Sequence, residues 1–287
     1  MPQRVTGGGM RVDAHQHFWR LADRAGAWPP PALEAIHRDF APADLAPLLQ
    51  RAGVGSSVLV QTLPTDADTD WLLAVAHDTP FVKGVVGWVD LKSPQAVTRL
   101  EALARDPLLK GVRPMLQDLP DDDWIADPAT APAAEAMARL GLVFDALVQP
   151  RHLPALTMFA TRHPTLRIVI DHLAKPAIAR GEWPAWRDGL ARLAALPQVH
   201  CKLSGLLTEA RPGADAAALQ PWLQAAWTSF GPARLVWGSD WPVLLLAADY
   251  ARWCDLTERL LDGVEPPPTA AERAAVLGHN AAALYRL

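Results

Sequence analysis

The sequence predicts a single α/β domain built as an eight-stranded (β/α)8 barrel of the TIM type. Short runs of apolar and β-branched residues recur eight times, and helical patterns separate them. The length of 287 residues suits one such barrel. The first expected strand leads into Phe18-Trp19-Arg20 rather than into a glycine cluster, which argues against an open doubly wound sheet with a phosphate loop.

Each strand is expected where apolar and β-branched residues cluster. The expected strand ranges are 11–17, 57–62, 85–90, 110–115, 142–149, 167–172, 200–204 and 235–240.

The helices are expected from apolar periodicity and from end signals, such as Ser93-Pro94 at a start and Gly53 or Gly141 after an end. The expected helical ranges are 39–53, 93–103, 133–140, 150–163, 186–196, 216–230, 250–261 and about 270 to 287. The segment 18–42 is a long first loop, rich in proline around Trp28, and we expect it to lie over the barrel mouth.

Composition excludes several classes of protein. Half of the residues are hydrophobic, so the chain can form a core, and the net charge is 27 − 31 = −4 with the basic residues scattered, which argues against a nucleic-acid partner. Two cysteines cannot build a disulfide framework, and no apolar run is long enough for a membrane span. Residues 1–9 contain no apolar signal segment, so we expect a disordered lead-in, a barrel domain over 10–287 and a cytoplasmic location.

Candidate catalytic residues lie where the strands end, because barrel enzymes place their chemistry there. Asp13, His15 and His17 are two residues apart on the first strand, so they are expected to share one face. Two imidazoles so placed could bind one metal ion or polarise one carbonyl group. A pair of hydrogen-bonded core histidines is an equally open alternative.

Two further strands contribute an acid and a third imidazole. Asp240 ends the eighth strand, which lies beside the first in a closed barrel, so it should face His15 and His17 as general base or metal ligand. A turn aspartate before Pro242 is the alternative. His172 ends the sixth strand, whereas Asp171 has the opposite parity and is expected to be structural.

Polar residues on other strands are candidates for substrate binding. Gln61, Arg113, Gln149 and Lys202 could hold substrate oxygens, although Arg113 could instead reach the rim or pair with Asp118. Tryptophan is abundant, and those near strand ends or in the first loop are expected to wall the mouth: Trp19, Trp28, Trp88 and Trp241. Those near helices are expected to pack: Trp183, Trp186, Trp222 and Trp227.

The motifs together resemble the amidohydrolase superfamily. V-D-A-H-Q-H at 12–17, I-D-H at 170–172 and G-S-D-W-P at 238–242 are similar to its lactonase branch, typified by L-fuconolactone, L-rhamnonolactone and 2-pyrone-4,6-dicarboxylate hydrolases. K-G-V-R-P-M-L-Q at 110–117, C-K-L-S-G at 201–205 and N-A-A-A-L-Y at 280–285 fit the same branch. The resemblance implies a distorted barrel and transfers catalytic roles to His15, His17, His172 and Asp240.

The sequence departs from the dinuclear members of the superfamily. Those members carry a carbamylated lysine on strand four and a histidine at the end of strand five, where this chain has Arg113 and Gln149. His152 could substitute for the second, but a bridged two-metal site is not expected. The resemblance leaves open one divalent ion on His15, His17 and Asp240, with zinc favoured, or catalysis without metal.

These observations predict a hydrolase that opens a small lactone ring, with a sugar lactone as the expected substrate. Asp240 takes a proton from water, the histidines stabilise the oxyanion directly or through one ion, and Asp240 then protonates the ring alkoxide. A free aspartate is a weak base at neutral pH, which favours a metal. The alternatives are a metal-dependent decarboxylase of the same superfamily and a non-catalytic ligand-binding barrel.

Overall fold

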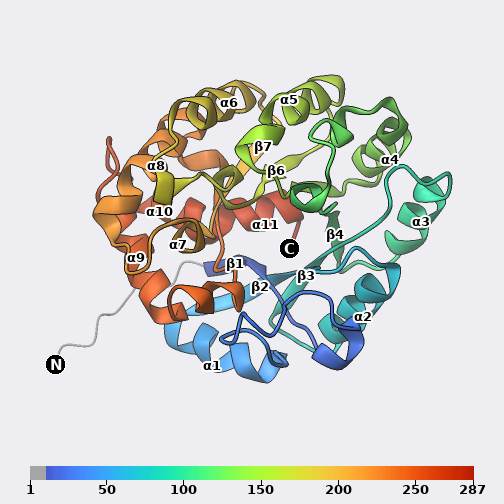
Figure 1. Cartoon of the computed structure of the whole chain (residues 1–287), viewed down its shortest axis with the longest axis horizontal. Helices are drawn as coiled ribbons and strands as arrows, with labels where there is room; N and C mark the ends of the chain where they lie inside the picture. Colours follow the sequence, from blue (N-terminus) through green and yellow to red (C-terminus); the bar gives the residue numbers. More distant parts are fainter. Residues whose placement is uncertain (1–10) are drawn as a thin grey trace.

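The predicted barrel is confirmed by the computed structural model, which describes residues 11–287. Eight parallel strands are hydrogen-bonded in chain order, and the helices form an outer ring around them (Figure 1). The predicted lead-in at residues 1–9 lies outside the described residues. The strands are β1 Arg11–Gln16, β2 Val54–Val60, β3 Val82–Gly87, β4 Leu109–Val112, β5 Val143–Ala146, β6 Ile168–Ile170, β7 Val199–Leu203 and β8 Leu235–Trp237.

The barrel is closed between the ends of β8 and β1. Gln16 and Trp241 form a parallel bridge. The backbone N–H of Asp240 donates to the carbonyl of His15 at 2.8 Å, and that of His17 donates to Trp241 at 2.7 Å. The predicted juxtaposition of the first and eighth strand ends is therefore present.

The helices follow the predicted alternation, except that α2 and the short α7 were not predicted. Gly53 and Gly141 adopt φ of 66° and 72° and end α1 and α4, as their positions predict. The sequence analysis missed α2, whose signals are a Thr65 N-cap and two acidic residues in the first turn. The helices are α1 Pro42–Ala52, α2 Asp66–His77, α3 Ala96–Leu103, α4 Ala131–Leu140, α5 Leu153–Arg162, α6 Pro184–Ala194, α7 Leu206–Glu209, α8 Ala216–Phe230, α9 Tyr250–Asp262, α10 Ala270–Ala274 and α11 Asn280–Tyr285.

The lower barrel interior is a small apolar core, plugged by the C-terminal helix. Valines and one alanine from six strands meet side chains of α11, which crosses the centre of the barrel in Figure 1. The members of this core are Val12, Ala14, Val58, Val60, Val86, Val143, Val169, Val236, Ala281, Leu284 and Tyr285. The plug closes one end, so access to the interior is from the carboxyl ends of the strands.

An irregularity in β1 decides which of its side chains reach the site. Asp13 of β1 pairs with Ser57 of β2, and Gln16 pairs with Leu59. β1 therefore advances three residues where β2 advances only two. Val12 and Ala14 belong to the interior core before this shift. The alternation is broken between them and His17, so the prediction that Asp13 shares the face of His15 is wrong.

Asp13 instead joins β1 to its neighbours behind the site. Its carboxylate accepts hydrogen bonds from the backbone N–H of Ser239 at 2.8 Å and from the hydroxyl of Tyr250 on α9 at 3.0 Å. The carboxylate thus fastens the closing seam of the barrel.

The long first loop lies against the barrel mouth. Its two ends are held by an antiparallel bridge between Trp19 and Phe40. Ala27 and Trp28, in the middle of the loop, line the principal cavity, as predicted for Trp28. Over residues 11–287, no helix combines the length and the apolar character that crossing a bilayer requires.

Candidate active site

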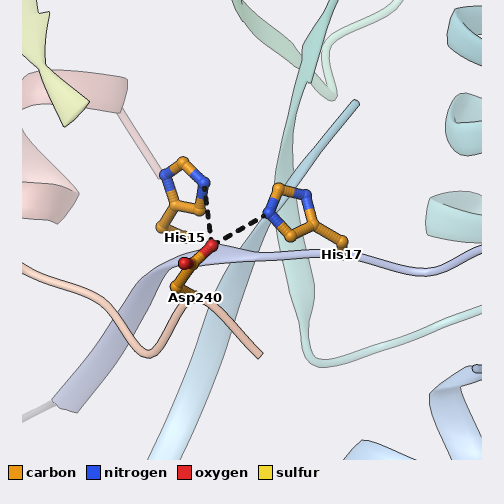
Figure 2. Close-up of side chains that lie close together, drawn as sticks. All are labelled: His15, His17 and Asp240. Carbon is orange, nitrogen blue, oxygen red and sulfur yellow. Dashed lines mark hydrogen bonds and ion pairs between the residues drawn. The ribbon is translucent and has the colours of Figure 1, made fainter. Parts of the chain in front are cut away.

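Three histidine side chains converge on one carboxylate oxygen. Asp240 Oδ1 lies 3.3 Å from Nε2 of His17, 3.7 Å from Nε2 of His15 and 3.8 Å from Nε2 of His172. Figure 2 shows two of these imidazoles on β1 and the chain that follows it, both directed at the same oxygen of Asp240. All four side chains are buried, so the cluster forms a dry base for the space above it.

Two of the histidines are oriented through the nitrogen that faces away from Asp240. Nδ1 of His17 lies 2.7 Å from the carbonyl oxygen of Val60, to which it donates. Nδ1 of His172 lies 2.8 Å from the hydroxyl of Ser204. Because His17 carries its proton on Nδ1 and donates it to Val60, its Nε2 lone pair faces the centre of the cluster.

His15 lies between two acids and two bases. Its Nδ1 is 3.3 Å from Asp171 Oδ1 and 3.1 Å from Lys202 Nζ. Its Nε2 faces Asp240 and lies 3.3 Å from Nη1 of Arg113. Burial and the ammonium of Lys202 lower the pKa of His15 well below its usual value, so the ring is neutral. Each nitrogen has a donor and an acceptor beside it, so either tautomer can be satisfied.

The backbone that positions the third imidazole is irregular. After β6 the chain turns, with His172 at φ 53° and Leu173 at φ 51°. The turn ends the strand alternation, so Asp171 and His172 both reach the cluster. The parity argument that placed Asp171 and His172 on opposite faces is wrong, because it assumed that the strand continues through His172, whereas the structural role expected of Asp171 stays a prediction.

The shifted pKa values leave Asp240 ionised and the surrounding imidazole rings uncharged at neutral pH. Burial raises the pKa of Asp240, but the neighbouring imidazoles of His172 and His17 outweigh it and hold the pKa below its ordinary value. Burial lowers the pKa of His172 to about 4 and also lowers that of His17. At neutral pH the cluster therefore offers one carboxylate and imidazole lone pairs to a cation or a proton donor.

A buried ionic network supports the cluster from below. Lys202 Nζ donates to Asp145 Oδ2 at 2.5 Å and forms an ion pair with Asp171 Oδ1 at 2.9 Å. Tyr285 of the C-terminal plug donates to Asp145 Oδ2 at 2.7 Å. Sequence reasoning missed Asp145 and this role of Asp171, although Val143 with Asp145, and Val169 with Asp171, share the parity of the interior core.

A cavity of about 840 Å³ opens above the cluster. His17, His172, Asp240 and Arg113 contribute to its base, whereas His15 is fully buried behind them. Its volume suits a small-molecule substrate. The aromatic walls are Trp28, Trp88 and Trp124, and further polar lining includes Thr62, Asp90, Gln117, Asp118, Lys175, Thr208 and Glu209.

Of the residues expected to bind substrate, Arg113 and Trp28 line this cavity. Gln61 is fully buried and instead donates to the backbone carbonyl of Arg113 at 2.6 Å, so it supports the arginine. Gln149 lies in a neighbouring hollow, where its side chain accepts from Arg151 at 3.0 Å.

Lys202 and Trp241 are also absent from the cavity lining. Lys202 is fully buried in the ionic network because its partners are two carboxylates below the cluster. Trp241 packs edge-on against Phe18 and Phe40. Neither side chain is therefore placed to contact a substrate in this cavity.

The other expected tryptophan positions are divided between wall and core. Trp88 lines the cavity as predicted, and Trp124 joins it unpredicted. Trp19 is fully buried against Phe40. Trp183, Trp186 and Trp222 pack on one another beside the helices, and Trp227 is buried, as predicted.

Three sequence features lie outside the site. His152 is directed at Asp122, 3.8 Å away, rather than at the histidine cluster. The three consecutive aspartates at residues 121–123 are exposed, which is typical of a solvated acidic loop. Cys201 is fully buried, and burial raises the pKa of its thiol, in accord with a packing role.

The sequence comparisons identify the family. A model described as Amidohydrolase matches residues 12–287. The chain belongs to the amidohydrolase family. It is 56% identical to a curated L-fucono-1,5-lactonase of Burkholderia ambifaria over 96% of each chain. It is 40% identical to an L-fucono-1,5-lactonase of Burkholderia multivorans, covering 98% of this chain and 97% of that one.

A solved amidohydrolase from Burkholderia multivorans with bound zinc superimposes with a TM-score of 0.89 at 40% identity, covering 97% of this chain and 99% of the other. The donor set of the present amidohydrolase fits a divalent ion. Neighbouring ligand atoms of a tetrahedral ion lie roughly 3.3–3.5 Å apart. The distances from Asp240 Oδ1 to the Nε2 atoms are 3.3–3.8 Å, and His15, His17 and Asp240 can place ligand atoms within 4.8 Å of one another.

Proposed function

We propose that this amidohydrolase opens the ring of a sugar lactone, with a lactone of the L-fucono-1,5-lactone type as the first substrate to test. The observation that carries the proposal is the convergence of three Nε2 atoms on Asp240 Oδ1 at the base of a tryptophan-walled cavity. Two curated lactonases, at 56% and 40% identity over nearly the whole chain, support this substrate class.

Asp240 is the general base in the proposed reaction. It is ionised at neutral pH and borders the cavity, so it can accept a proton from a water that attacks the lactone carbonyl. The tetrahedral intermediate then expels the ring oxygen as the carbon–oxygen bond breaks. Asp240 returns its proton to that oxygen, so the product is the open hydroxy acid and the carboxylate is regenerated.

Arg113 is placed to stabilise the oxygen that gains negative charge. Its guanidinium lines the cavity, and its Nε finds no acceptor within residues 11–287. Gln61 and Asp171 hold it from behind, since Nη1 lies 3.4 Å from Asp171 Oδ2 and Nη2 donates to the carbonyl of Gln61. A fixed cation at this position lowers the energy of an oxyanion without having to reorganise.

His15, His17 and Asp240 are the residues that would hold one divalent ion, with His172 beside them, and we propose zinc. When bound there, zinc supplies a Lewis acid that makes water a stronger acid at neutral pH. This chemistry would compensate for the weak basicity of Asp240, whose pKa lies below its ordinary value. The Nδ1 contact of His17 with Val60 and that of His15 with Asp171 favour this use of their Nε2 atoms.

The remaining substrate oxygens and carbons would meet the walls. Asp90, Gln117 and Asp118 offer acceptors and donors to hydroxyl groups, and Trp28 offers a rigid apolar surface to a sugar ring.

The test is a pH-indicator assay with a panel of γ- and δ-sugar lactones, since ring opening releases acid. The proposal expects turnover of at least one 1,5-lactone and at least a hundredfold less with Asp240→Asn. Asp188→Asn, which changes an exposed carboxylate on α6 that pairs with Arg187, serves as the matched control. Absence of turnover across the panel would contradict the substrate class.

The decarboxylase alternative has less support. The histidine that it requires at the end of β5 is replaced by Gln149, and His152 faces Asp122. Release of carbon dioxide from aromatic acids in the same assay series would favour that alternative over the lactonase.

A further inference from the structure

The ionic network below the cluster is centred on the ammonium group of Lys202. Lys202 Nζ is fully buried, donates to Asp145 Oδ2 at 2.5 Å and forms an ion pair with Asp171 Oδ1 at 2.9 Å. It also lies 3.1 Å from Nδ1 of His15, on the opposite side of the ring from Asp240. Two buried carboxylates and an imidazole thus surround one ammonium group.

Two residues of this network, His15 and Asp171, also belong to a second group that could hold a metal ion. His15, Asp171 and His172 can place ligand atoms within 4.8 Å of one another, and this group shares His15 with the first one. Carboxylate and imidazole ligands suit divalent ions such as Mn²⁺ and Zn²⁺. Buried carboxylates need a compensating cation, and here the ammonium of Lys202 supplies it.

We propose that Lys202 is a built-in replacement for a second metal ion and that it limits the centre to one divalent ion. The inference adds to the proposed function by assigning a positioning role to a residue that touches no substrate. It concerns the difference in metal content between two forms of the protein, and it therefore does not depend on lactonase activity.

The packing around Lys202 supports this role. The hydroxyl of Tyr285 donates to Asp145 Oδ2 at 2.7 Å, so the acid is held by the C-terminal plug as well as by the ammonium. Arg113 approaches the other oxygen of Asp171, at 3.4 Å. Removal of the lysine side chain would leave Asp145 without a cationic partner among the described residues. It would also leave a space bordered by Asp145 Oδ2, Asp171 Oδ1 and His15 Nδ1, which are the ligands proposed for the additional ion.

The experiment compares the metal content of native protein and Lys202→Ala. Both are produced with Mn²⁺, freed of loose ions on a desalting column and analysed by elemental mass spectrometry. The inference expects Lys202→Ala to hold about one equivalent of Mn²⁺ per chain more than the native protein. This difference is expected whether the native protein holds one ion or none, so failure of the single-ion proposal remains distinguishable.

Two controls locate the additional ion. Lys110→Ala removes another barrel lysine, whose Nζ donates to the carbonyl of Arg286 at 2.9 Å, and should keep the native metal content. Lys202→Ala combined with Asp145→Asn removes one of the proposed ligands and should return the content to the native value. Equal metal content in folded Lys202→Ala and native protein would overturn the inference, and so would an extra ion that survives Asp145→Asn.

Loss of folding in Lys202→Ala is also informative. In that case Mn²⁺ should restore a cooperative thermal transition, because the ion takes the place of the ammonium. The double variant should fold without metal, since Asp171 keeps Arg113 as its partner. If neither Mn²⁺ nor the second substitution restores folding, the inference is wrong.

Discussion

Asp13 offers a quantitative test of how the barrel seam is held. The side chain is fully buried, and its Oδ1 accepts from the backbone N–H groups of Ser239 at 2.8 Å and His15 at 3.2 Å. Oδ2 accepts from Tyr250 at 3.0 Å. Burial raises the pKa of Asp13 from 3.8 to about 6, and the hydrogen bonds oppose that rise only in part.

The raised pKa fixes the sign of the pH effect. Because the folded protein binds this proton more tightly than the unfolded chain, the contribution to stability is complete below about pH 4 and is lost as the pH rises through about 6. A difference of about two pKa units makes this contribution fall by about 2 kcal/mol between about pH 4.5 and pH 7.5. Asp13→Asn keeps the acceptor oxygen but cannot titrate.

The assay is urea unfolding of native protein and Asp13→Asn at these two pH values. The free energy of unfolding of the variant, relative to native, should improve by about 2 kcal/mol at the higher pH. Asp13→Ala should be destabilised by about 2–4 kcal/mol at both, because it leaves buried donors without an acceptor. A relative stability of Asp13→Asn that does not change with pH would refute the reasoning.

Three other predictions concern the cavity wall, the backbone beside His172 and the thiol of Cys254 on α9. Trp124→Ala should raise KM by roughly three- to tenfold and leave kcat within about twofold, measured by steady-state lactone hydrolysis, if the ring only stacks on substrate; a loss confined to kcat would exclude that role. Gly205→Ala should lower kcat at least about tenfold, because the new Cβ would lie 2.6 Å from Nδ1 of His172. Gly181→Ala is the control: its φ of +68° is close to the +65° of Gly205, but its Cβ would meet open space, so this variant should remain active. Equal activity of the two variants would contradict the prediction. Burial raises the pKa of Cys254 from 9.0 to about 12, so alkylation by iodoacetamide at mildly alkaline pH should be roughly a thousandfold slower than for a free thiol, and rapid labelling would show that the site opens.

The sequence predicted the barrel well because its signals are local. All eight strands and the ends of α1 and α4 follow from apolar runs and from Gly53 and Gly141. The meeting of His15, His17 and Asp240 followed from one topological fact, the adjacency of the first and last strands.

The failures have a shared physical cause, which is that side-chain parity holds only while a strand stays regular. The register shift in β1 separates Asp13 from His15. The turn after β6, with His172 in the left-handed region, brings Asp171 and His172 to the same cluster. Neither irregularity has a glycine or proline to announce it.

The sequence pattern also could not predict how deep in the barrel an inward-pointing side chain lies. Lys202 and Arg113 both point inward, but only Arg113 reaches the cavity. The difference depends on partners from distant strands, since Asp145 and Asp171 retain the lysine below the cluster.

The central claim is that Asp240 performs the proton transfers of lactone hydrolysis. The most direct measurement is kcat of Asp240→Asn on the lactone that the native protein turns over fastest, with circular dichroism to verify the fold. The account predicts a loss of about 10²–10⁴-fold, the usual contribution of a general base, in a folded variant. Retention of more than about a tenth of native kcat would contradict it.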